Sequence, residues 1–298
     1  LNKKRNTEIL RQIKYVTSVL NKNNIFPLYL KGAGNLLDDL YSDVGERIMG
    51  DIDLLVHEND FIPSVILMLD NGFLCVENNT EINIRESKHY PRIYHPDFIC
   101  DVEIHRMPVE KMNIDWFNSN IVYTEKKKVK TMNGCFVQSN KHKIIHNFIH
   151  DHLEHQEFGN INKKIPLRDI YDLYLLSKGY PLNSVISEIK YQEKAIGYFA
   201  FVKYVYRLDD NFFAKKNFAF RILKMKNDLN LDSVIFRWVY PRFHYRKVRN
   251  RYYLSLFIKA FYSGETRQKI FNKISSKQYY IEKYNRVKKS MHEKNSNE

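Results

Sequence analysis

Two aspartates separated by one residue, Asp51 and Asp53, open the apolar run Asp-Ile-Asp-Leu-Leu-Val. Side chains alternate along a β-strand, so the two carboxylates share a face at a spacing of about 7 Å, while Ile52 and Leu54 point into the core. Carboxylates this close repel each other unless a cation lies between them, and their oxygens suit Mg²⁺ or Mn²⁺. The alternative is a solvated pair at a strand start. The apolar residues that follow favour the metal site.

A second acidic strand is predicted from the alternation between Ile99 and His105, which places Asp101, Glu103 and His105 on one face. Glu103 is the candidate third carboxylate, and Asp101 is its rival. Three carboxylates can hold two divalent ions, which orient a nucleoside triphosphate and activate an acceptor hydroxyl. His105 is either a contact to the nucleotide or acceptor, or a histidine hydrogen-bonded at a strand end.

Glycines follow the first predicted strand, where Leu28-Tyr29-Leu30 stops at Lys31-Gly32-Ala33-Gly34. Glycine permits a tight turn and a close approach to a ligand, and backbone N–H groups in such a turn can bind phosphate oxygens. Arg47, in the loop before the two aspartates, can add a fixed positive charge for phosphates. Its alternative partner is a neighbouring acid, Glu46 or Asp43.

The elements that must position these groups follow from periodicity and turn residues. A first helix buries Ile9, Ile13 and Val16 and is capped by Asn6 or Thr7. Further predicted elements are a helix over Phe61–Leu69 ended by Asn71-Gly72, short strands at Phe73–Val76 and Glu81–Ile84, a hairpin of Ile121–Val129 with Cys135–Val137, and helices over His142–Gln156, Leu167–Leu176, Lys190–Tyr206 and Phe213–Leu229.

Three regions follow from this pattern: an α/β domain over residues 1–138, a helical domain over 139–240 and a basic helical tail over 241–298. The chain has 298 residues and a formal net charge of +14. Residues 241–298 hold 15 Lys and Arg and four acids, so most of the excess charge lies there. Basic residues with tyrosines suit RNA, while the amphipathic stretch Tyr252–Phe261 suits an anionic membrane surface. Solvated helix faces with a disordered end are the third interpretation.

The cellular location is predicted from what the sequence contains. Three cysteines, Cys75, Cys100 and Cys135, have no metal or disulfide spacing and fit a reducing compartment. No apolar run has the length of a membrane span, and residues 1–10 have no signal-peptide core. A cytoplasmic protein, peripheral to the membrane if the tail binds lipid, is therefore expected.

The residues resemble the uncharacterised nucleotidyltransferase family of the DNA polymerase β-like superfamily. That family reads L-K-G, L-Y, R-x-x-x-D-x-D-x-L-V, G-F/Y and (D/E)-x-H in this order. The matching segments are Leu30-Lys31-Gly32, Leu40-Tyr41, Arg47 to Val56, Gly72-Phe73 and Glu103-Ile104-His105. The resemblance implies an α+β fold, a minimal nucleotidyltransferase with a mixed sheet and helices, followed by a mostly helical region.

Carried over residue by residue, the resemblance makes Asp51, Asp53 and Glu103 the metal ligands and catalytic carboxylates. Gly32 would face a phosphate, with Lys31 beside it. The superfamily's usual Gly-Ser is Gly32-Ala33 here, so the hydroxyl that often touches the phosphates is absent. The third acid, Glu103, is one methylene longer than aspartate.

Histidines recur in the predicted helix over His142–Gln156, where His142, His146 and His150 follow at steps of four with Glu154 next. The order is not the H-E-x-x-H of a zinc protease. The family places His150 and the later Arg168-Asp169-x-x-Asp172 against the active-site cleft, in contact with the nucleotide or acceptor. Helix packing is the alternative, and it is favoured for His146 and Asp172.

The predicted function is the Mg²⁺- or Mn²⁺-dependent transfer of a nucleoside monophosphate from a nucleoside triphosphate, such as ATP, to a hydroxyl or phosphate acceptor, with release of pyrophosphate. Sugar, glycan or metabolite acceptors are favoured over tRNA or protein. The competing prediction is a catalytically idle transferase fold that binds RNA or an anionic membrane through its basic tail.

Overall fold

The computed structural model describes residues 1–76, 87–159, 167–207, 217–232, 246, 249–251, 253–277 and 280–281. The chain forms two compact units, Leu1–Val234 and Ile235–Glu298. The division predicted near residue 138 lies inside the first unit and stays a prediction.

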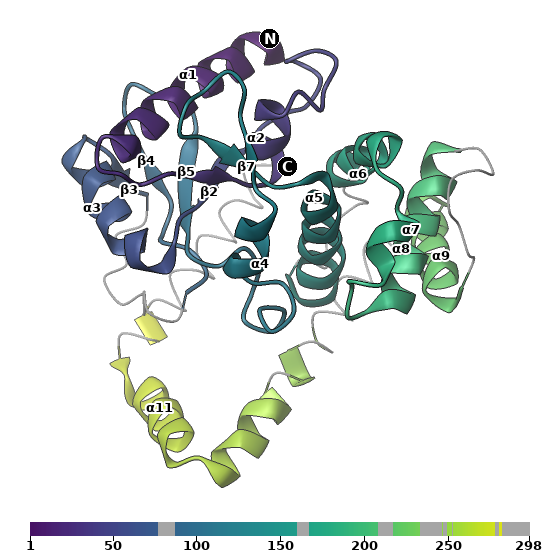
Figure 1. The fold of residues 1–298 in the computed structure, drawn as a ribbon. Helices are drawn as coiled ribbons and strands as arrows, with labels where there is room; N and C mark the ends of the chain where they lie inside the picture. The colour runs from purple at the N-terminus through teal and green to yellow at the C-terminus, as the bar shows by residue number, and fades with distance from the viewer. Residues whose placement is uncertain are drawn as a thin grey trace, which may run out of the picture. The chain divides into compact units, whose positions relative to one another are not determined.

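A mixed seven-stranded sheet forms the centre of the first unit, in the strand order β3-β4-β5-β2-β1-β7-β6 (Figure 1). Its strands are β1 (Leu28–Tyr29), β2 (Asp51–Leu55), β3 (Leu74–Cys75), β4 (Ile93–Tyr94), β5 (Asp101–His105), β6 (Lys127–Lys128) and β7 (Phe136–Val137). β2 runs parallel to β5 and antiparallel to β1. The predicted α+β class with a mixed sheet is confirmed.

Each face of the sheet meets its own core, because side chains alternate along the strands. Ile52 and Leu54 of β2 pack with residues of α1 (Asn2–Asn21) and α3 (Phe61–Asp70), and the two helices lie over that face (Figure 1). Leu55 packs into the other core, which the later helices complete. The acidic residues of β2 therefore alternate with residues that anchor the strand in the first core.

The first helix begins at Asn2, so the prediction of a cap at Asn6 or Thr7 is wrong. Asn6 is fully buried, and its side chain donates hydrogen bonds to the carbonyls of Val44 and Arg47. It fixes the loop that leads to β2. The stop predicted at Asn71-Gly72 is confirmed, since α3 ends at Asp70 and Gly72 has a φ of +88°.

The predicted hairpin is correct only at its end. Its first residues belong to the short helix α4 (Ser119–Thr124), whose N-cap residue Asn118 accepts a hydrogen bond from the Ile121 amide through its side chain. The antiparallel pairing is confined to β6 and β7. β3 lies within the predicted strand Phe73–Val76, while the strand predicted at Glu81–Ile84 lies outside the described residues.

Helices follow the sheet, as predicted. They are α5 (Asn140–Asn147), the π-helix η2 (Phe148–Gly159), α6 (Leu167–Gly179), α7 (Asn183–Ile186), α8 (Gln192–Tyr206), α9 (Phe218–Asp232) and, in the second unit, α11 (Gly264–Ser275). The single helix predicted over His142–Gln156 is thus an α-helix continued by a π-helix, in which each turn holds more residues. Among the described helices, none has both the length and the apolar character needed to cross a bilayer.

Candidate functional site

The acidic residues of β2 and β5 lie on one face of the sheet. The strands are parallel neighbours, and their register pairs Asp51 with Asp101 and Asp53 with Glu103. Paired residues on adjacent strands present their side chains to the same side. The structure therefore brings together two acidic rows that lie about fifty residues apart in the sequence.

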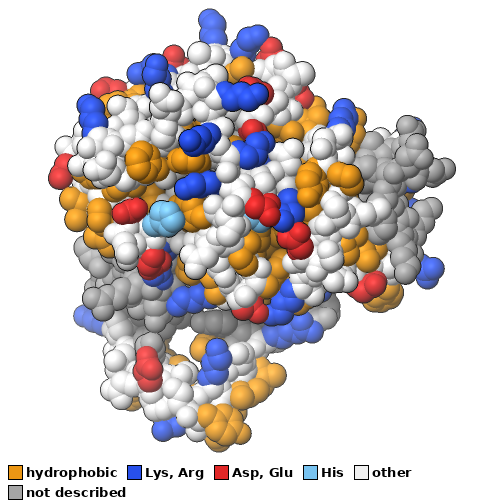
Figure 2. Space-filling view, in the orientation of Figure 1, with side chains coloured by type: hydrophobic (Ala, Val, Ile, Leu, Met, Phe, Trp, Pro, Cys, Tyr) orange, Lys and Arg blue, Asp and Glu red, His pale blue; other side chains and the backbone are white. Residues whose placement is uncertain are grey.

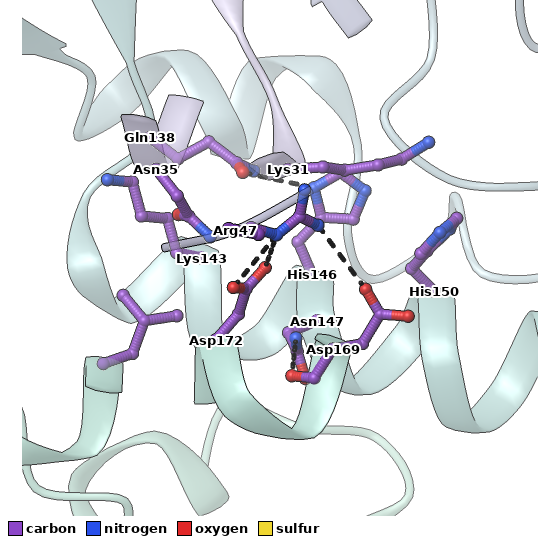
Figure 3. Close-up of a pocket in the computed structure, with 11 residues that line it drawn as sticks. Lys31, Asn35, Arg47, Gln138, Lys143, His146, Asn147, His150, Asp169 and Asp172 are labelled. Atoms are coloured by element: carbon purple, nitrogen blue, oxygen red, sulfur yellow. Dashed lines mark hydrogen bonds and ion pairs between the residues drawn. The ribbon is translucent and has the colours of Figure 1, made fainter. Parts of the chain in front are cut away.

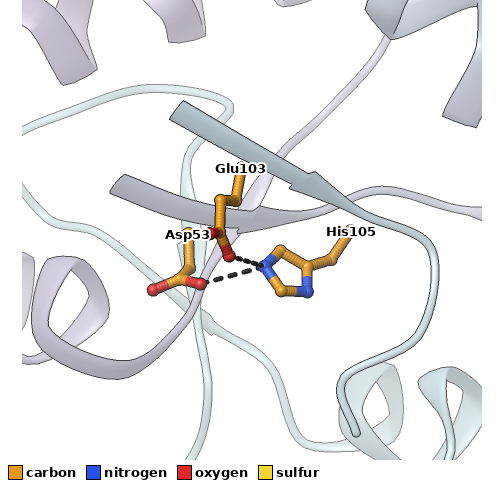
Figure 4. Close-up of side chains that lie close together, drawn as sticks. All are labelled: Asp53, Glu103 and His105. Carbon is orange, nitrogen blue, oxygen red and sulfur yellow. Dashed lines mark hydrogen bonds and ion pairs between the residues drawn. The ribbon is translucent and has the colours of Figure 1, made fainter. Parts of the chain in front are cut away.

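Within the described part of the chain, one group of three metal-ligating side chains, Asp53, Glu103 and His105, has its ligand atoms within 4.8 Å of one another (Figure 4). His105 Nε2 lies 2.9 Å from Asp53 Oδ1 and 3.3 Å from Glu103 Oε2. Its side chain is fully buried. An imidazole N–H that faces two carboxylate oxygens donates to them, so His105 holds both carboxylates in place. Neither Asp51, a predicted metal ligand, nor Asp101 is a member of this group.

Two basic side chains neutralise the carboxylates. Lys31 Nζ lies 2.7 Å from Asp53 Oδ1. Arg92 Nε lies 2.7 Å from Glu103 Oε1, and Arg92 Nη2 lies 3.3 Å from Asp51 Oδ2. The Lys31 side chain is 19% exposed, whereas that of Arg92 is 50% exposed. The first ion pair is therefore enclosed, and the second is open to solvent.

Sequence reasoning missed Arg92. It directly precedes β4, and only the antiparallel pairing of Ile93 with Val102 carries it to the acidic face. Arg92 could have been found only by predicting which strands pair, because its spacing from Glu103 in the sequence does not indicate a contact.

The three carboxylates have different proton affinities. Burial disfavours the charged form of Asp53, but Lys31 and His105 outweigh it and hold the pKa of Asp53 well below its ordinary value. Burial likewise opposes ionisation of Glu103, and the hydrogen bond from His105 still lowers its pKa. Burial and the charge of Asp53 raise the pKa of Asp51. Asp51 is thus the carboxylate whose charge is least compensated.

This donor set fits a hard divalent cation. Asp51, Asp53 and Glu103 supply carboxylate oxygens from adjacent strands, and such oxygens are the ligands that Mg²⁺ and Mn²⁺ prefer. Burial raises the pKa of Asp51 most, and repulsion from Asp53 raises it further; a bound cation would relieve that repulsion.

The predicted glycine turn differs from the turn that forms. Lys31, with a φ of +48°, takes the left-handed conformation and begins α2 (Lys31–Leu37), so Gly32 and Gly34 lie inside this helix. A Cβ on Gly32 would stand 2.2 Å from Arg47 Nη1, and one on Gly34 would stand 2.5 Å from the Tyr29 carbonyl oxygen. The glycines allow a guanidinium and a strand to approach α2. That Gly32 faces a phosphate stays a prediction.

Arg47 pairs with α6 rather than with the acids near it in sequence. Its Nε lies 2.8 and 3.1 Å from the two carboxylate oxygens of Asp172, and its Nη2 lies 3.7 Å from Asp169. Glu46 and Asp43, the predicted alternatives, accept hydrogen bonds from other residues. Arg47 therefore ties the loop before β2 to the helical region, and Asp172 is more than a packing residue.

A narrow cleft, partly open to solvent, lies beside this ion pair (Figure 3). It is lined by Lys31, Asn35, Arg47, Gln138, Lys143, His146, Asn147, His150, Asp169, Asp172 and Leu176. Lys31 connects the cleft to the acidic group, because the same side chain binds Asp53. Five residues that the sequence analysis singled out for the active site therefore line one cleft: Lys31, Arg47, His150, Asp169 and Asp172.

Two buried amides of the cleft have unused hydrogen-bonding atoms. Asn35 is 4% exposed and Gln138 is 1% exposed. No described group hydrogen-bonds to Oδ1 of Asn35 or to Nε2 of Gln138. A buried acceptor and a buried donor without partners are costly, so these atoms are suited to a bound polar group. Sequence reasoning identified neither residue.

The predicted line of histidines does not share one environment. His142 packs edge-on against Phe117, and Glu154 accepts a hydrogen bond from the Glu110 amide. His146 and His150 face the cleft with ring centroids 6.3 Å apart. His146 is buried and hydrogen-bonds to Gln138, and burial lowers its pKa well below the ordinary value. It is therefore a neutral cleft residue near physiological pH.

Comparisons with known proteins add a family match. A family model described as an uncharacterised nucleotidyltransferase matches residues 1–213. Among solved structures, the chain is similar to the solution structure of the antibiotic-resistance factor ANT(2'')-Ia, with 12% sequence identity and a TM-score of 0.43, over 70% of this chain and 99% of that chain. No curated protein matches the sequence. The family match covers the acidic strands and the helices α5 and α6 that line the cleft.

Proposed function

The chain belongs to the uncharacterised nucleotidyltransferase family, and on this premise we propose that it moves a nucleoside monophosphate from a nucleoside triphosphate to a hydroxyl or phosphate acceptor. The acceptor oxygen attacks the α-phosphorus, the bond to the bridging β-phosphate oxygen breaks, and pyrophosphate leaves. The observation that carries the proposal is the register of β2 and β5. It pairs Asp53 with Glu103 on the neighbouring strand, and Asp51 follows on the same face of β2.

In this proposal Asp51, Asp53 and Glu103 are the ligands of Mg²⁺ or Mn²⁺. Such an ion, when bound, supplies charge neutralisation for the transferred phosphoryl group. His105 orients two of the three carboxylates, because its Nε2 faces an oxygen of each. Its role is thus positioning, in place of the predicted contact with the nucleotide.

The phosphates are assigned to the basic residues at the start of α2 and beside β4. Lys31 lies between the acidic group and the cleft, and Gly32 presents its amide next to it. Arg92 is half exposed, so its guanidinium can turn from the carboxylates toward a triphosphate. Arg47 is bound to Asp172, and in this proposal it shapes the cleft.

The cleft is assigned to a polar, uncharged part of the nucleotide or acceptor. Apart from Lys31, its Lys and Arg side chains are already paired, Arg47 with Asp172 and Lys143 with Asp38. The unused atoms of the two buried amides offer one acceptor and one donor. Hydroxyl groups serve both, so a hydroxyl group of the nucleotide or of the acceptor is assigned to this position.

The test is Mg²⁺-dependent pyrophosphate release from each nucleoside triphosphate, in the presence of a small-molecule cell extract as the source of acceptor. Asp51→Asn should lower release by about a hundredfold or more, because charge stabilisation of the phosphoryl group is lost. Asp97→Asn, which removes an 85% exposed carboxylate elsewhere, is the matched control and should leave release unchanged.

Two further variants decide the third ligand. Glu103→Gln should abolish release, and Asp101→Asn should retain most of it. Binding of each nucleoside triphosphate with Mg²⁺, measured by calorimetry, needs no acceptor. If the native protein binds none of them, the enzyme proposal is overturned and the idle transferase fold stands in its place.

A further inference from the structure

The second unit carries large apolar side chains on its surface. Residues 253–262 are helical, and α11 follows after Ser263. Ten large apolar side chains on these helices and just beyond them are about half exposed or more. They are Tyr253, Leu254, Phe257, Ile258, Phe261, Tyr262, Phe271, Ile274, Tyr280 and Ile281. A soluble surface rarely gathers so many, and such patches mark interaction sites.

The apolar residues of the helix over residues 253–262 form a stripe. Leu254, Phe257, Ile258 and Phe261 recur at spacings of three and four, which places them on one helix face. The rings of Phe257 and Phe261 lie 5.0 Å apart, edge to face, within this stripe. Exposure is 62% for Phe257 and 68% for Phe261, so the ring pair faces solvent.

The two helices are joined by a defined connection. The Ser263 side chain accepts a hydrogen bond from the Thr266 amide and caps α11. Arg267 Nη1 donates to the carbonyls of Ala260 and Phe261, which are among the last of the preceding helix. A cation at a helix C-terminus stabilises it. The exposed stripe thus belongs to an ordered pair of helices.

Positive charge surrounds these apolar residues. Between residues 249 and 281 the sequence has seven basic residues and a single acid, Glu265. In Figure 2, hydrophobic side chains reach the surface over the segment that holds α11, with Lys and Arg side chains beside them. An amphipathic helix with basic residues and exposed aromatic rings is the form that lies in a bilayer interface.

We propose that the helix over residues 253–262 and α11 bind the surface of an anionic lipid bilayer, with Phe257 and Phe261 inserted among the acyl chains and the basic residues on the lipid phosphates. Leu254, Ile258 and Ile274 have no ring to stack on a base, and they gain only by leaving water. This favours lipid over RNA. A second copy of the same basic surface would repel this one, which favours an anionic partner over self-association.

The test is co-sedimentation of the full chain with vesicles of phosphatidylglycerol and phosphatidylcholine in equal parts. Binding should be strong at low salt and weak on pure phosphatidylcholine, and added salt should reduce it only in part because apolar insertion remains. Phe257→Glu should lower the partition coefficient by about tenfold or more, because a charged side chain opposes insertion.

The matched control is Phe218→Glu, the same substitution at a 76% exposed phenylalanine of α9 in the first unit. It should bind vesicles like the native chain, and circular dichroism should show both variants folded. Equal losses in the two variants, or equal binding to neutral and anionic vesicles, overturn the proposal. If the chain binds single-stranded RNA but not vesicles, the proposal is overturned and the surface binds nucleic acid. If the chain is a dimer that Phe257→Glu dissociates, the proposal is overturned and the surface binds a second copy.

Discussion

At the scale of single residues, the chain buries several charges and pairs each with an opposite one. Lys31 with Asp53 and Arg47 with Asp172 are such pairs. The sequence showed the two aspartates of β2 clearly, since a strand of alternating acids and aliphatic residues is a local pattern. Their partners could not be found in the same way, because Arg47 and Asp172 lie 125 residues apart and meet only through the fold.

Lys143 should give the stability of the protein a characteristic pH dependence. Burial lowers its pKa from 10.5 to about 8, although Asp38 partly offsets the effect. Between these values the unfolded chain holds a proton that the folded chain has released, so the contribution of Lys143 to stability rises with pH through this window. Lys143→Met should therefore lack a rise that the native protein shows in urea unfolding between pH 8 and pH 10.5.

Lys127→Met is the control for this prediction. Lys127 contacts the same carboxylate, but its side chain is 41% exposed while that of Lys143 is 3% exposed. It should keep most of the native pH dependence, because burial is the largest cause of the lowered pKa of Lys143 and the charge of Lys127 only adds to it. An unchanged slope in Lys143→Met would show that the buried ammonium does not titrate in this range.

At the scale of elements, α2 is held close to both the sheet and the helical region through its glycines. From the sequence, the glycines were expected to form a tight turn. In the structure the residue in the left-handed conformation is Lys31, and the glycines allow close packing instead. The order of strands and helices was largely predictable from periodicity. The π-helix after α5 was not, because its sequence still has the spacing of an ordinary helix.

Gly32→Ala should destabilise the protein by about 1–3 kcal/mol, because the new methyl group overlaps a guanidinium that Asp172 holds in place. The better helix propensity of alanine opposes this by about 1 kcal/mol. Gly50→Ala, whose Cβ would meet nothing nearer than 3.9 Å, should be close to neutral. Both are measured by urea unfolding.

A double-mutant cycle identifies the cause. In an Arg47→Ala background the overlap with the guanidinium is gone and only Met49 Sδ lies close, at 3.0 Å, so Gly32→Ala should cost clearly less than in the native background. An equal loss in both backgrounds would mean that the glycine is needed for a reason other than its contact with Arg47.

At the scale of the whole molecule, the two units differ in how their apolar residues are placed. The first unit buries its apolar residues in two cores on the faces of a sheet. The described helices of the second unit leave theirs at the surface. The sequence predicted a basic, amphipathic tail from composition, but composition alone did not distinguish RNA from lipid. Our proposal of lipid rests on the exposed aliphatic stripe.

Hydrogen exchange should follow this difference. Amides of α11, which has few buried side chains around it, should exchange faster than those of α1, whose Ile9, Ile13 and Val16 are fully buried. Anionic vesicles should slow exchange over residues 253–275 and leave β2 and β5 unchanged. Slowing in the strands as well would mean that lipid acts on the whole fold.

The pairing of Lys31 and Arg92 with the acidic group has a consequence for how the protein would behave in a cell. At rest the chain carries its own counterions, so the fold need not wait for a metal to become complete. In the proposed reaction, removal of magnesium should therefore stop nucleotidyl transfer and leave the fold intact.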